Sequence, residues 1–160
     1  MIIIVEGPDG AGKTTTINAL LKSHPGSTTR HFSNPKSDEE AYDYYKVYAQ
    51  AIKEADPEKV TIFDRSWYSD LVYGPVIRNR QEMSNLHAEM LEALVISNGG
   101  GGFVIYCTAP LSVLWSRCKK RGETYIQNIE QLGKISDGYK KVLSSKCNLP
   151  VIRFDTAARW

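Results

Sequence analysis

The sequence has no long hydrophobic run, few cysteines and no strong excess of charge of one sign. Its apolar runs have the length of a strand and fall short of the roughly 20 residues that cross a membrane as a helix. No basic region precedes the first apolar run, so no secretory signal is visible. These absences predict a cytoplasmic protein that does not contact a membrane.

The 3 cysteines are odd in number and lack the spacing of metal ligands, which favours free thiols over disulfides or a zinc site. The formal net charge of +2 is too small to indicate a nucleic-acid polymer as a partner. With 160 residues, of which 42% are hydrophobic, the chain is long enough for one domain with a substantial core. We therefore expect a single domain over residues 1–160.

The most informative motif lies near the N-terminus and fits the phosphate-binding loop pattern G-x-x-x-x-G-K-[ST]. A β-branched run precedes it and apolar residues at helical spacing follow it, which is the strand–loop–helix order that the motif requires. Glycines let the backbone approach phosphate, and successive N–H groups then converge on anionic oxygens where the helix begins. Lys13 can reach the β- and γ-phosphates and the Thr14 hydroxyl can bind Mg²⁺, so we expect ATP and Mg²⁺ as cofactors. The predicted nucleotide-binding residues are Gly7, Pro8, Asp9, Gly10, Ala11, Gly12, Lys13, Thr14 and Thr15.

Strand-like and helix-like segments alternate along the whole chain, which predicts an α/β protein with the three-layer P-loop NTPase fold. Its parallel sheet should contain five strands, at residues 1–6, 27–32, 60–63, 103–107 and 151–154. Helices are expected at residues 15–24, 38–55, 67–73, 81–97, 109–121 and 123–145. Ligands of such sheets bind beyond the carboxyl ends of the strands, which are the positions of the glycine loop, of Asp64-Arg65 and of Asp155-Thr156.

The motifs of a switch GTPase are missing. Such a protein would need D-x-x-G at the end of a strand, but Asp64-Arg65-Ser66-Trp67 lacks the glycine, and no N-K-x-D occurs. A small phosphotransferase is therefore the economical interpretation. A nucleotide-binding regulatory module that does not catalyse turnover remains an alternative.

Several motifs in order resemble those of thymidylate kinases. The segment Glu6–Thr15 is similar to the opening E-G-x-D-G-x-G-K-[ST]-T of that family. Asp64-Arg65-Ser66, with Ser69 and Tyr73, is similar to its segment D-R-[YFH]-x-x-S-x-x-A-Y. The basic stretch that ends at Arg121-Gly122-Glu123 resembles the family's lid, which would cover about residues 117–127. Deoxynucleoside kinases share this architecture and usually show Glu-Arg-Ser at the second motif.

The chain also departs from the thymidylate kinase pattern. It is shorter than typical cellular members, and Ser66 replaces the usual aromatic residue after the arginine. Gln50 and tyrosines occupy the helix where the family carries a base-recognising arginine. These differences leave the preferred base open, and a compact viral deoxynucleotide kinase is one setting that fits them.

The resemblance and the chemistry of phosphoryl transfer together suggest catalytic roles. Asp64 would bind Mg²⁺ with Thr14, because hard oxygen ligands suit that ion. The resemblance implies that Arg65 positions the acceptor phosphate, and its planar fork suits phosphate oxygens. Arg117 and Arg121 are four residues apart on one helix face, so both can close over the transferring phosphate. Either could instead belong to a solvated basic helix end.

Acceptor-binding residues are predicted from the resemblance and from side-chain chemistry. In the family, the residue at Asp9 approaches the 3′-hydroxyl of the acceptor sugar. Tyr45 and Tyr48 could stack on the base while Gln50 pairs with its polar edge, although a tyrosine-rich helix packed on the core explains them equally well. The other candidates for contact with the acceptor are Lys36, Arg65, Tyr73 and Arg78.

The predicted reaction transfers the γ-phosphoryl group of ATP to a deoxynucleoside monophosphate, with a dTMP-like acceptor, and yields the diphosphate. An alternative is a deoxynucleoside kinase, which would need a base near the 5′-hydroxyl, and Glu6 and Asp64 are the obvious carboxylates. The partners would be small nucleotides rather than a nucleic-acid polymer. The resemblance also implies a homodimer.

Overall fold

All strands of the structure belong to one parallel sheet. The protein is described by a computed structural model over residues 1–33 and 38–158. The strands are β1 (Ile2–Glu6), β2 (Thr28–His31), β3 (Thr61–Asp64), β4 (Gly102–Thr108) and β5 (Val151–Asp155), in the order β2-β3-β1-β4-β5 across the sheet. The prediction of an α/β fold with a five-stranded parallel sheet is confirmed.

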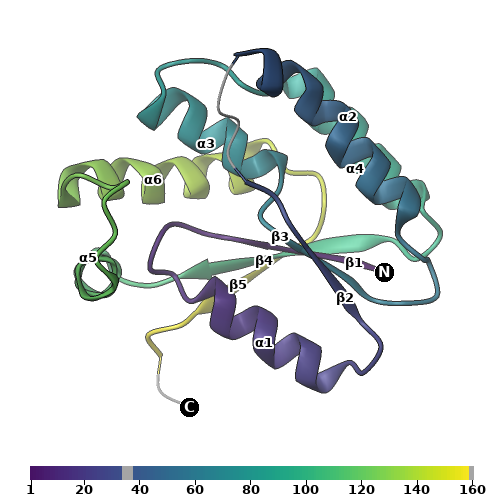
Figure 1. The fold of residues 1–160 in the computed structure, drawn as a ribbon, viewed down its shortest axis with the longest axis horizontal. Coiled ribbons are helices and arrows are strands. Elements are labelled where there is room, and N and C mark those ends of the chain that lie inside the picture. The colour runs from purple at the N-terminus through teal and green to yellow at the C-terminus, as the bar shows by residue number, and fades with distance from the viewer. Residues whose placement is uncertain (34–37, 159–160) are drawn as a thin grey trace.

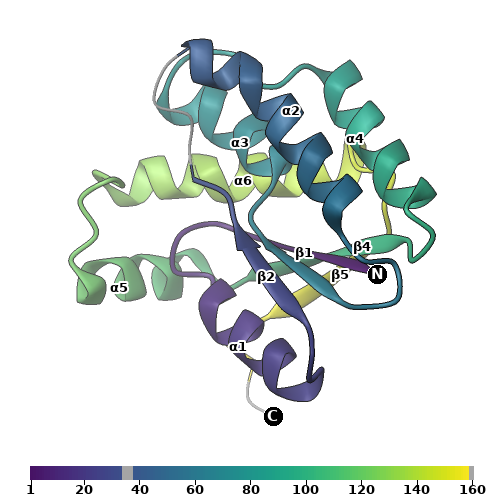
Figure 2. The ribbon, with the colours of Figure 1, turned by 45° about the vertical axis from the view of Figure 1, so that its right-hand side comes forward.

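Helices cover both faces of this sheet unequally. They are α1 (Lys13–Ser23), α2 (Asp38–Glu54), α3 (Trp67–Ile77), α4 (Asn85–Ser97), α5 (Leu111–Arg121) and α6 (Ile129–Ser145). Figure 1 and Figure 2 show α1 below the sheet and α2, α3, α4 and α6 above it, while α5 lies beyond the end of β4. The glycine loop between β1 and α1 therefore lies at the carboxyl edge, with elements of both layers around it.

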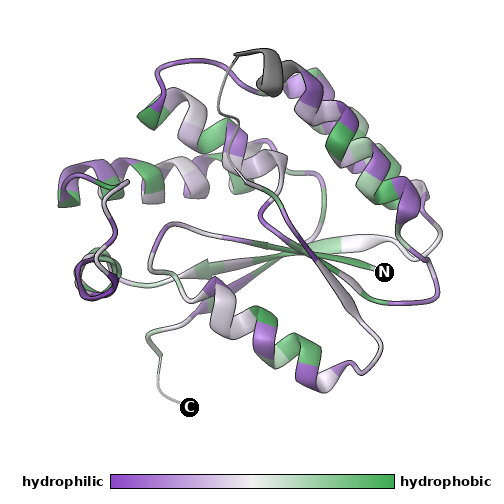
Figure 3. Ribbon diagram, in the orientation of Figure 1, coloured by the Kyte–Doolittle hydropathy of each residue, from purple (hydrophilic) through white to green (hydrophobic). Residues whose placement is uncertain are grey.

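The central strand β1 is buried along its whole length, because strands flank it on both sides and helices cover both faces. Its β-branched residues suit this position, and each buried isoleucine contributes roughly 1.5–3 kcal/mol through removal of apolar area from water. Figure 3 shows hydrophobic residues concentrated in the middle strands and in stripes along the helices. The edge strands β2 and β5 are mostly exposed.

Helix α3 is longer than expected, since Gly74-Pro75 does not end it. The helix continues to Ile77, and the backbone N–H of Arg78 donates to the carbonyl oxygens of Tyr73 and Gly74. Proline removes one N–H donor and restricts φ, but a helix can bridge it when neighbouring carbonyls find other donors. The predicted end at Tyr73, directly before Gly74-Pro75, was wrong for this reason.

Helices α4 and α6 begin later than predicted, because polar side chains cap them. Ser84 accepts a hydrogen bond from the N–H of His87 and starts α4 at Asn85 rather than at Gln81. Asn128 accepts from the N–H of Gln131 and starts α6 at Ile129 rather than at Glu123. Each cap satisfies a backbone donor that the first turn of the helix leaves unpaired.

No helix within residues 1–33 and 38–158 combines the length and the hydropathy of a membrane span. Cys107 and Cys118 are buried, Cys147 is half-buried, and all are free thiols, as the sequence predicted.

Candidate active site

The glycine loop forms a tight turn between β1 and α1. Gly12 has φ +82°, in the left-handed region, where a side chain would be strained. A Cβ atom at Gly7 would lie 2.3 Å from the carbonyl oxygen of Cys107, so only glycine fits there. The Lys13 ammonium donates to the carbonyl oxygens of Gly7 and Pro8, each at 2.9 Å. Burial and, to a lesser extent, the nearby Arg65 lower the pKa of Lys13 to about 8, although Asp9 and Glu6 act in the opposite direction.

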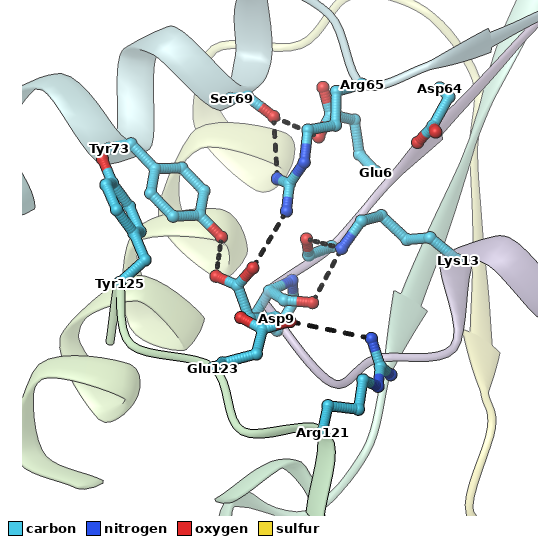
Figure 4. A network of polar contacts seen from close by, with 12 residues as sticks. Glu6, Asp9, Lys13, Asp64, Arg65, Ser69, Tyr73, Arg121, Glu123 and Tyr125 are labelled. Carbon is cyan, nitrogen blue, oxygen red and sulfur yellow. Dashed lines mark hydrogen bonds and ion pairs between the residues drawn. The ribbon is translucent and has the colours of Figure 1, made fainter. Parts of the chain in front are cut away.

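A cavity of about 140 Å³, which we call the loop cavity, lies against the loop. Figure 4 shows the polar side chains that converge on it from the ends of β1, β3 and α5. The cavity brings together the predicted loop lysine, both predicted metal ligands and two of the predicted catalytic arginines. Its lining residues are Asp9, Gly10, Ala11, Gly12, Lys13, Thr14, His31, Asp64, Arg65, Arg121 and Glu123.

Arg65 occupies a strained backbone position directly after β3. Its φ is +68°, which is rare for a residue with a side chain and costs of order 1–3 kcal/mol. The side chain is held on both arms, because Nη2 donates to Asp9 at 3.2 Å and Nη1 donates to Tyr139 at 3.1 Å and to Ser69 at 3.3 Å. The guanidinium also lies over the ring of Tyr73, 5.1 Å from its centroid. Such strain persists only where the surroundings fix it, and it often marks a functional residue.

Glu6 forms the buried centre of this arrangement. Its carboxylate is 0% exposed and accepts hydrogen bonds from the hydroxyls of Ser66 and Ser69, each at 2.8 Å, and of Tyr139 at 3.0 Å. Burial raises the pKa of Glu6, and Arg65 and these hydroxyls counteract part of the increase. Because Ser69 and Tyr139 also contact Arg65, Glu6 fixes the guanidinium indirectly. One feature of the sequence hints at this role, namely a charged residue at the end of a buried strand.

The two predicted metal ligands lie on the same cavity from different elements. Thr14 is in the first turn of α1, and Asp64 is the last residue of β3. Asp64 accepts a hydrogen bond from the Nδ1 atom of His31 at 2.8 Å. No cluster of three or more His, Cys, Asp or Glu side chains suited to a metal occurs in the part of the chain that the structure describes. A hydroxyl and one carboxylate fit Mg²⁺, which usually takes few protein ligands and completes its shell with water and substrate phosphates.

The two arginines of α5 differ in their surroundings. Arg117 donates to the carbonyl oxygen of Gly10 at 3.0 Å and to the Thr156 hydroxyl at 2.8 Å, and so ties the loop to the segment after β5. Arg121 is half exposed, lies 3.8 Å from Glu123 and lines the loop cavity. Both arginines also line a second cavity of about 350 Å³, which we call the flanking cavity. Its lining residues are Gly12, Thr15, Thr16, Ala19, Arg117, Arg121, Phe154 and Thr156.

The predicted base-binding residues of α2 are not on the loop cavity. Tyr48 is buried in the core and donates to Asp70 at 2.7 Å, so the packing alternative describes it correctly. Tyr45 stacks on His87, with centroids 4.7 Å apart, and Gln50 donates to Glu54 along the same helix. Tyr48 therefore packs against α3 and Tyr45 against α4, and neither faces the loop cavity.

The remaining acceptor candidates divide into two groups. Tyr73 donates to Asp9 and lies beneath the Arg65 guanidinium, so it supports two residues that line the loop cavity. Arg78 binds Glu82 and donates to Tyr125 at 2.7 Å, which joins α3 to the segment between α5 and α6. Lys36 lies outside the described residues.

The parallel sheet, the glycine loop and the arginine-bearing helix after β4 define a P-loop kinase fold. The family model described as polyphosphate kinase 2 (PPK2) matches residues 1–101, a span that includes the loop and Arg65. The chain therefore belongs to the polyphosphate kinase 2 family. No curated protein sequence matches it.

Solved structures support the same fold. The chain is similar to the YorR protein of Bacillus subtilis, crystallised in complex with phosphorylated GDP, with a TM-score of 0.80 and 24% identity over 98% of this chain and 86% of that one. It is also similar to deoxyadenosine kinase from M. mycoides with bound dATP, with a TM-score of 0.64 and 20% identity over 100% of this chain and 93% of that one. The same kinase with the products dCMP and dCDP gives a TM-score of 0.61 at 21% identity, over 99% of this chain and 92% of that one. At these identities the likeness concerns the fold.

Proposed function

We propose that this chain transfers the γ-phosphoryl group of Mg²⁺-bound ATP to a deoxynucleoside monophosphate. The observation that carries the proposal is the pairing of Lys13 and Arg65 on a single cavity of about 140 Å³. Lys13 and the loop N–H groups bind the donor phosphates, and Arg65 binds the transferring group and the acceptor phosphate. Membership of a kinase family supports this reading.

The flanking cavity supports a nucleotide as donor. Its volume of about 350 Å³ suits a nucleobase, and Phe154 and Ala19 offer apolar surface beside the loop. The guanidinium of Arg117 can stack on a flat ring. The name of the family suggests inorganic polyphosphate as an alternative donor. A bare phosphate chain, however, has no apolar group that would pack against Phe154 and Ala19 of the flanking cavity.

The acceptor side favours a substrate that already carries a phosphate. A monophosphate needs cations near the transferring group, and the Arg65 fork is fixed in that position. Asp9 accepts from Tyr73 and Arg65 and is 14% exposed, so an acceptor sugar hydroxyl can reach it. A dTMP-like acceptor is the form that the motif resemblance suggests.

A deoxynucleoside kinase is the second candidate. The acceptor hydroxyl of such an enzyme would need a carboxylate nearby to act as a base. Glu6 is unsuited to this task, since it is fully buried and already accepts from hydroxyl groups. Asp64 is 27% exposed and lines the loop cavity, which keeps this alternative open. The likeness to deoxyadenosine kinase also favours testing it.

In phosphoryl transfer the protein contributes mainly by aligning the two substrates and by neutralising charge on the phosphates, and it needs to form no covalent bond to them. An oxygen of the acceptor phosphate bonds to the γ-phosphorus while the bond from that phosphorus to the β-bridging oxygen breaks, which releases ADP. Lys13, Arg65 and Arg121 would neutralise charge on the transferring group. Thr14 and Asp64 would hold Mg²⁺, which would supply further neutralisation of the charge on the donor phosphates.

A turnover assay tests the proposal and separates its rivals. ATP or polyphosphate is offered with each natural nucleoside and each monophosphate, and diphosphate and monophosphate products are separated by chromatography. We expect deoxynucleoside diphosphates from ATP, and at least about a 10³-fold loss in Lys13→Met with the fold retained. Monophosphate products would favour the nucleoside kinase. Tight ATP binding with no acceptor phosphorylated would favour a regulatory module.

The homodimer implied by the resemblance stays a prediction. Helix α4 exposes Leu86, Met90 and Ile96, of which Leu86 is 65% exposed. Light scattering coupled to size-exclusion chromatography gives the molar mass in solution and checks the prediction directly.

A further inference from the structure

His31 is a residue of the loop cavity to which none of the sequence motifs assigns a task. It is the last residue of β2, and the parallel register pairs it with Asp64, the last residue of β3. Both side chains therefore leave the carboxyl edge of the sheet at neighbouring positions. Both also line the loop cavity together with Thr14.

The backbone around this pair is firmly held. The N–H of Phe32 donates to the carbonyl oxygen of Asp64 at 3.1 Å. The Phe32 ring is 4% exposed and packs against Tyr48 and Phe63, with centroids 4.8 and 5.1 Å apart. Buried packing thus fixes where the His31 side chain starts, although the imidazole itself is 63% exposed.

The contact between the two side chains leaves one carboxylate oxygen available. The Nδ1 atom of His31 lies 2.8 Å from Oδ2 of Asp64. Within residues 1–33 and 38–158, Oδ1 of Asp64 has no hydrogen-bond partner. A carboxylate tethered through one oxygen keeps its other oxygen in a defined direction, which is the function of an outer-sphere partner around a metal.

We infer that His31 is a positioning residue that orients Asp64 for Mg²⁺, an inference that rests on the proposed function. His31 touches neither the metal nor the nucleotide, and it acts by donating Nδ1–H to Asp64. Loss of an outer-sphere partner typically costs about 10–100-fold in metal affinity, and we expect a loss in that range here.

The side chains of asparagine and glutamine separate this role from a general effect of substitution. The amide nitrogen of asparagine coincides with Nδ1 of histidine, whereas that of glutamine coincides with Nε2. His31→Asn therefore keeps the donor to Asp64, and His31→Gln and His31→Ala remove it. The control His24→Ala alters an exposed histidine at the end of α1, distant from the loop cavity.

Calorimetry with a non-hydrolysable ATP analogue measures the effect without turnover. Each variant is titrated with the analogue in EDTA, and a separate metal-free sample without EDTA, with the analogue bound, is titrated with Mg²⁺. We expect unchanged analogue affinity in EDTA for all variants, and weaker Mg²⁺ affinity by about 10–100-fold only in His31→Ala and His31→Gln. Thermal unfolding followed by circular dichroism verifies that each variant is folded.

Three results would overturn the inference. Equal Mg²⁺ affinity in the wild type and His31→Ala would show that Asp64 needs no partner. A loss of analogue affinity in EDTA would make His31 a nucleotide contact instead. If Mg²⁺ does not bind the wild-type complex at all, the metal part of the proposed function fails with it, whereas the first two results leave that function intact.

Discussion

The loop cavity has two walls that are built in different ways. The inner wall consists of Asp9 and Arg65, with Tyr73 hydrogen-bonded to Asp9 behind it, and the outer wall consists of His31, Arg121 and Glu123. Arg65 is 15% exposed, whereas Arg121 is 50% exposed. Behind the inner wall, Glu6 and its hydroxyl partners hold the guanidinium in place. The inner wall is thus fixed before a ligand arrives, while the outer wall keeps rotamer freedom that binding must restrict.

The largest effect should come from the Arg65 guanidinium of the inner wall, whose two arms make separate contacts. In Arg65→Lys, a single ammonium cannot contact Asp9 on one side and Ser69 and Tyr139 on the other. We expect kcat to fall by at least about 10³-fold, and Arg121→Lys to lose only about tenfold, because an exposed lysine can still approach the phosphate. Steady-state kinetics of both variants measure the contrast. Equal losses would mean that the two walls do not differ in the way described.

The support behind the inner wall should have the second-largest effect. Glu6→Gln removes the buried charge and presents N–H groups to hydroxyls that donate, so Arg65 should shift and kcat should fall by about 10–100-fold. Glu82→Gln is the matched control, since Glu82 is buried and binds Arg78 and Arg80 away from the loop. Each variant should lose about 2 kcal/mol of unfolding free energy in urea, as buried polar networks do. A Glu6→Gln enzyme of normal kcat would confine Glu6 to stability.

Substitution of Arg117 should have a smaller effect on turnover, and it should change KM rather than kcat. Its contacts with Gly10 and Thr156 suggest that it shapes the loop rather than the transition state. In Arg117→Lys we expect KM for ATP to rise by about tenfold with kcat nearly unchanged, because weaker binding of the donor affects ground state and transition state alike. Initial rates over a range of ATP concentrations separate the two constants. A fall in kcat instead would support the lid role that the sequence predicts.

The smallest effect on turnover is expected at Asp70, a buried carboxyl away from the loop. Burial raises its pKa to about 7, although the Tyr48 hydroxyl lowers it, and the value in an unfolded chain is about 3.9. The folded state therefore holds more protons between about pH 4 and 7, so the contribution of Asp70 to unfolding free energy decreases as the pH rises through that window. The decrease is up to about 4 kcal/mol.

Urea unfolding of the wild type and Asp70→Asn at several pH values measures this contribution as a difference. The stability of the wild type relative to the variant should decline between about pH 4 and 7, with kcat the same in both. A difference that does not vary with pH would mean that Asp70 titrates normally in the folded protein.

The sequence predicted the order of elements well, because each depends on neighbouring residues. The run Ile2–Val5 and the spacing of apolar residues after Lys13 specify a strand and a helix locally. Errors occurred where one side chain decided a boundary, as at Ser84 and Asn128, whose caps outweigh the helix propensity of the preceding residues.

The site was predictable only in part. The glycine loop is contiguous, so its pattern alone indicates a phosphate-binding turn. Periodicity marked Tyr45 and Tyr48 as one helix face, but it could not say whether that face meets a ligand or another helix. Their contacts with α3 and α4 followed from tertiary packing, which no short pattern encodes.

The sequence by itself determined a strand, a glycine turn and a helix that can hold phosphate. Only the tertiary structure decided which polar groups meet each buried charge, since Glu6 meets Tyr139 across 133 positions and Arg117 meets Gly10 across 107. The physical reason is that backbone conformation responds to adjacent side chains, whereas the cost of burying a charge depends on whatever the fold brings within hydrogen-bonding distance.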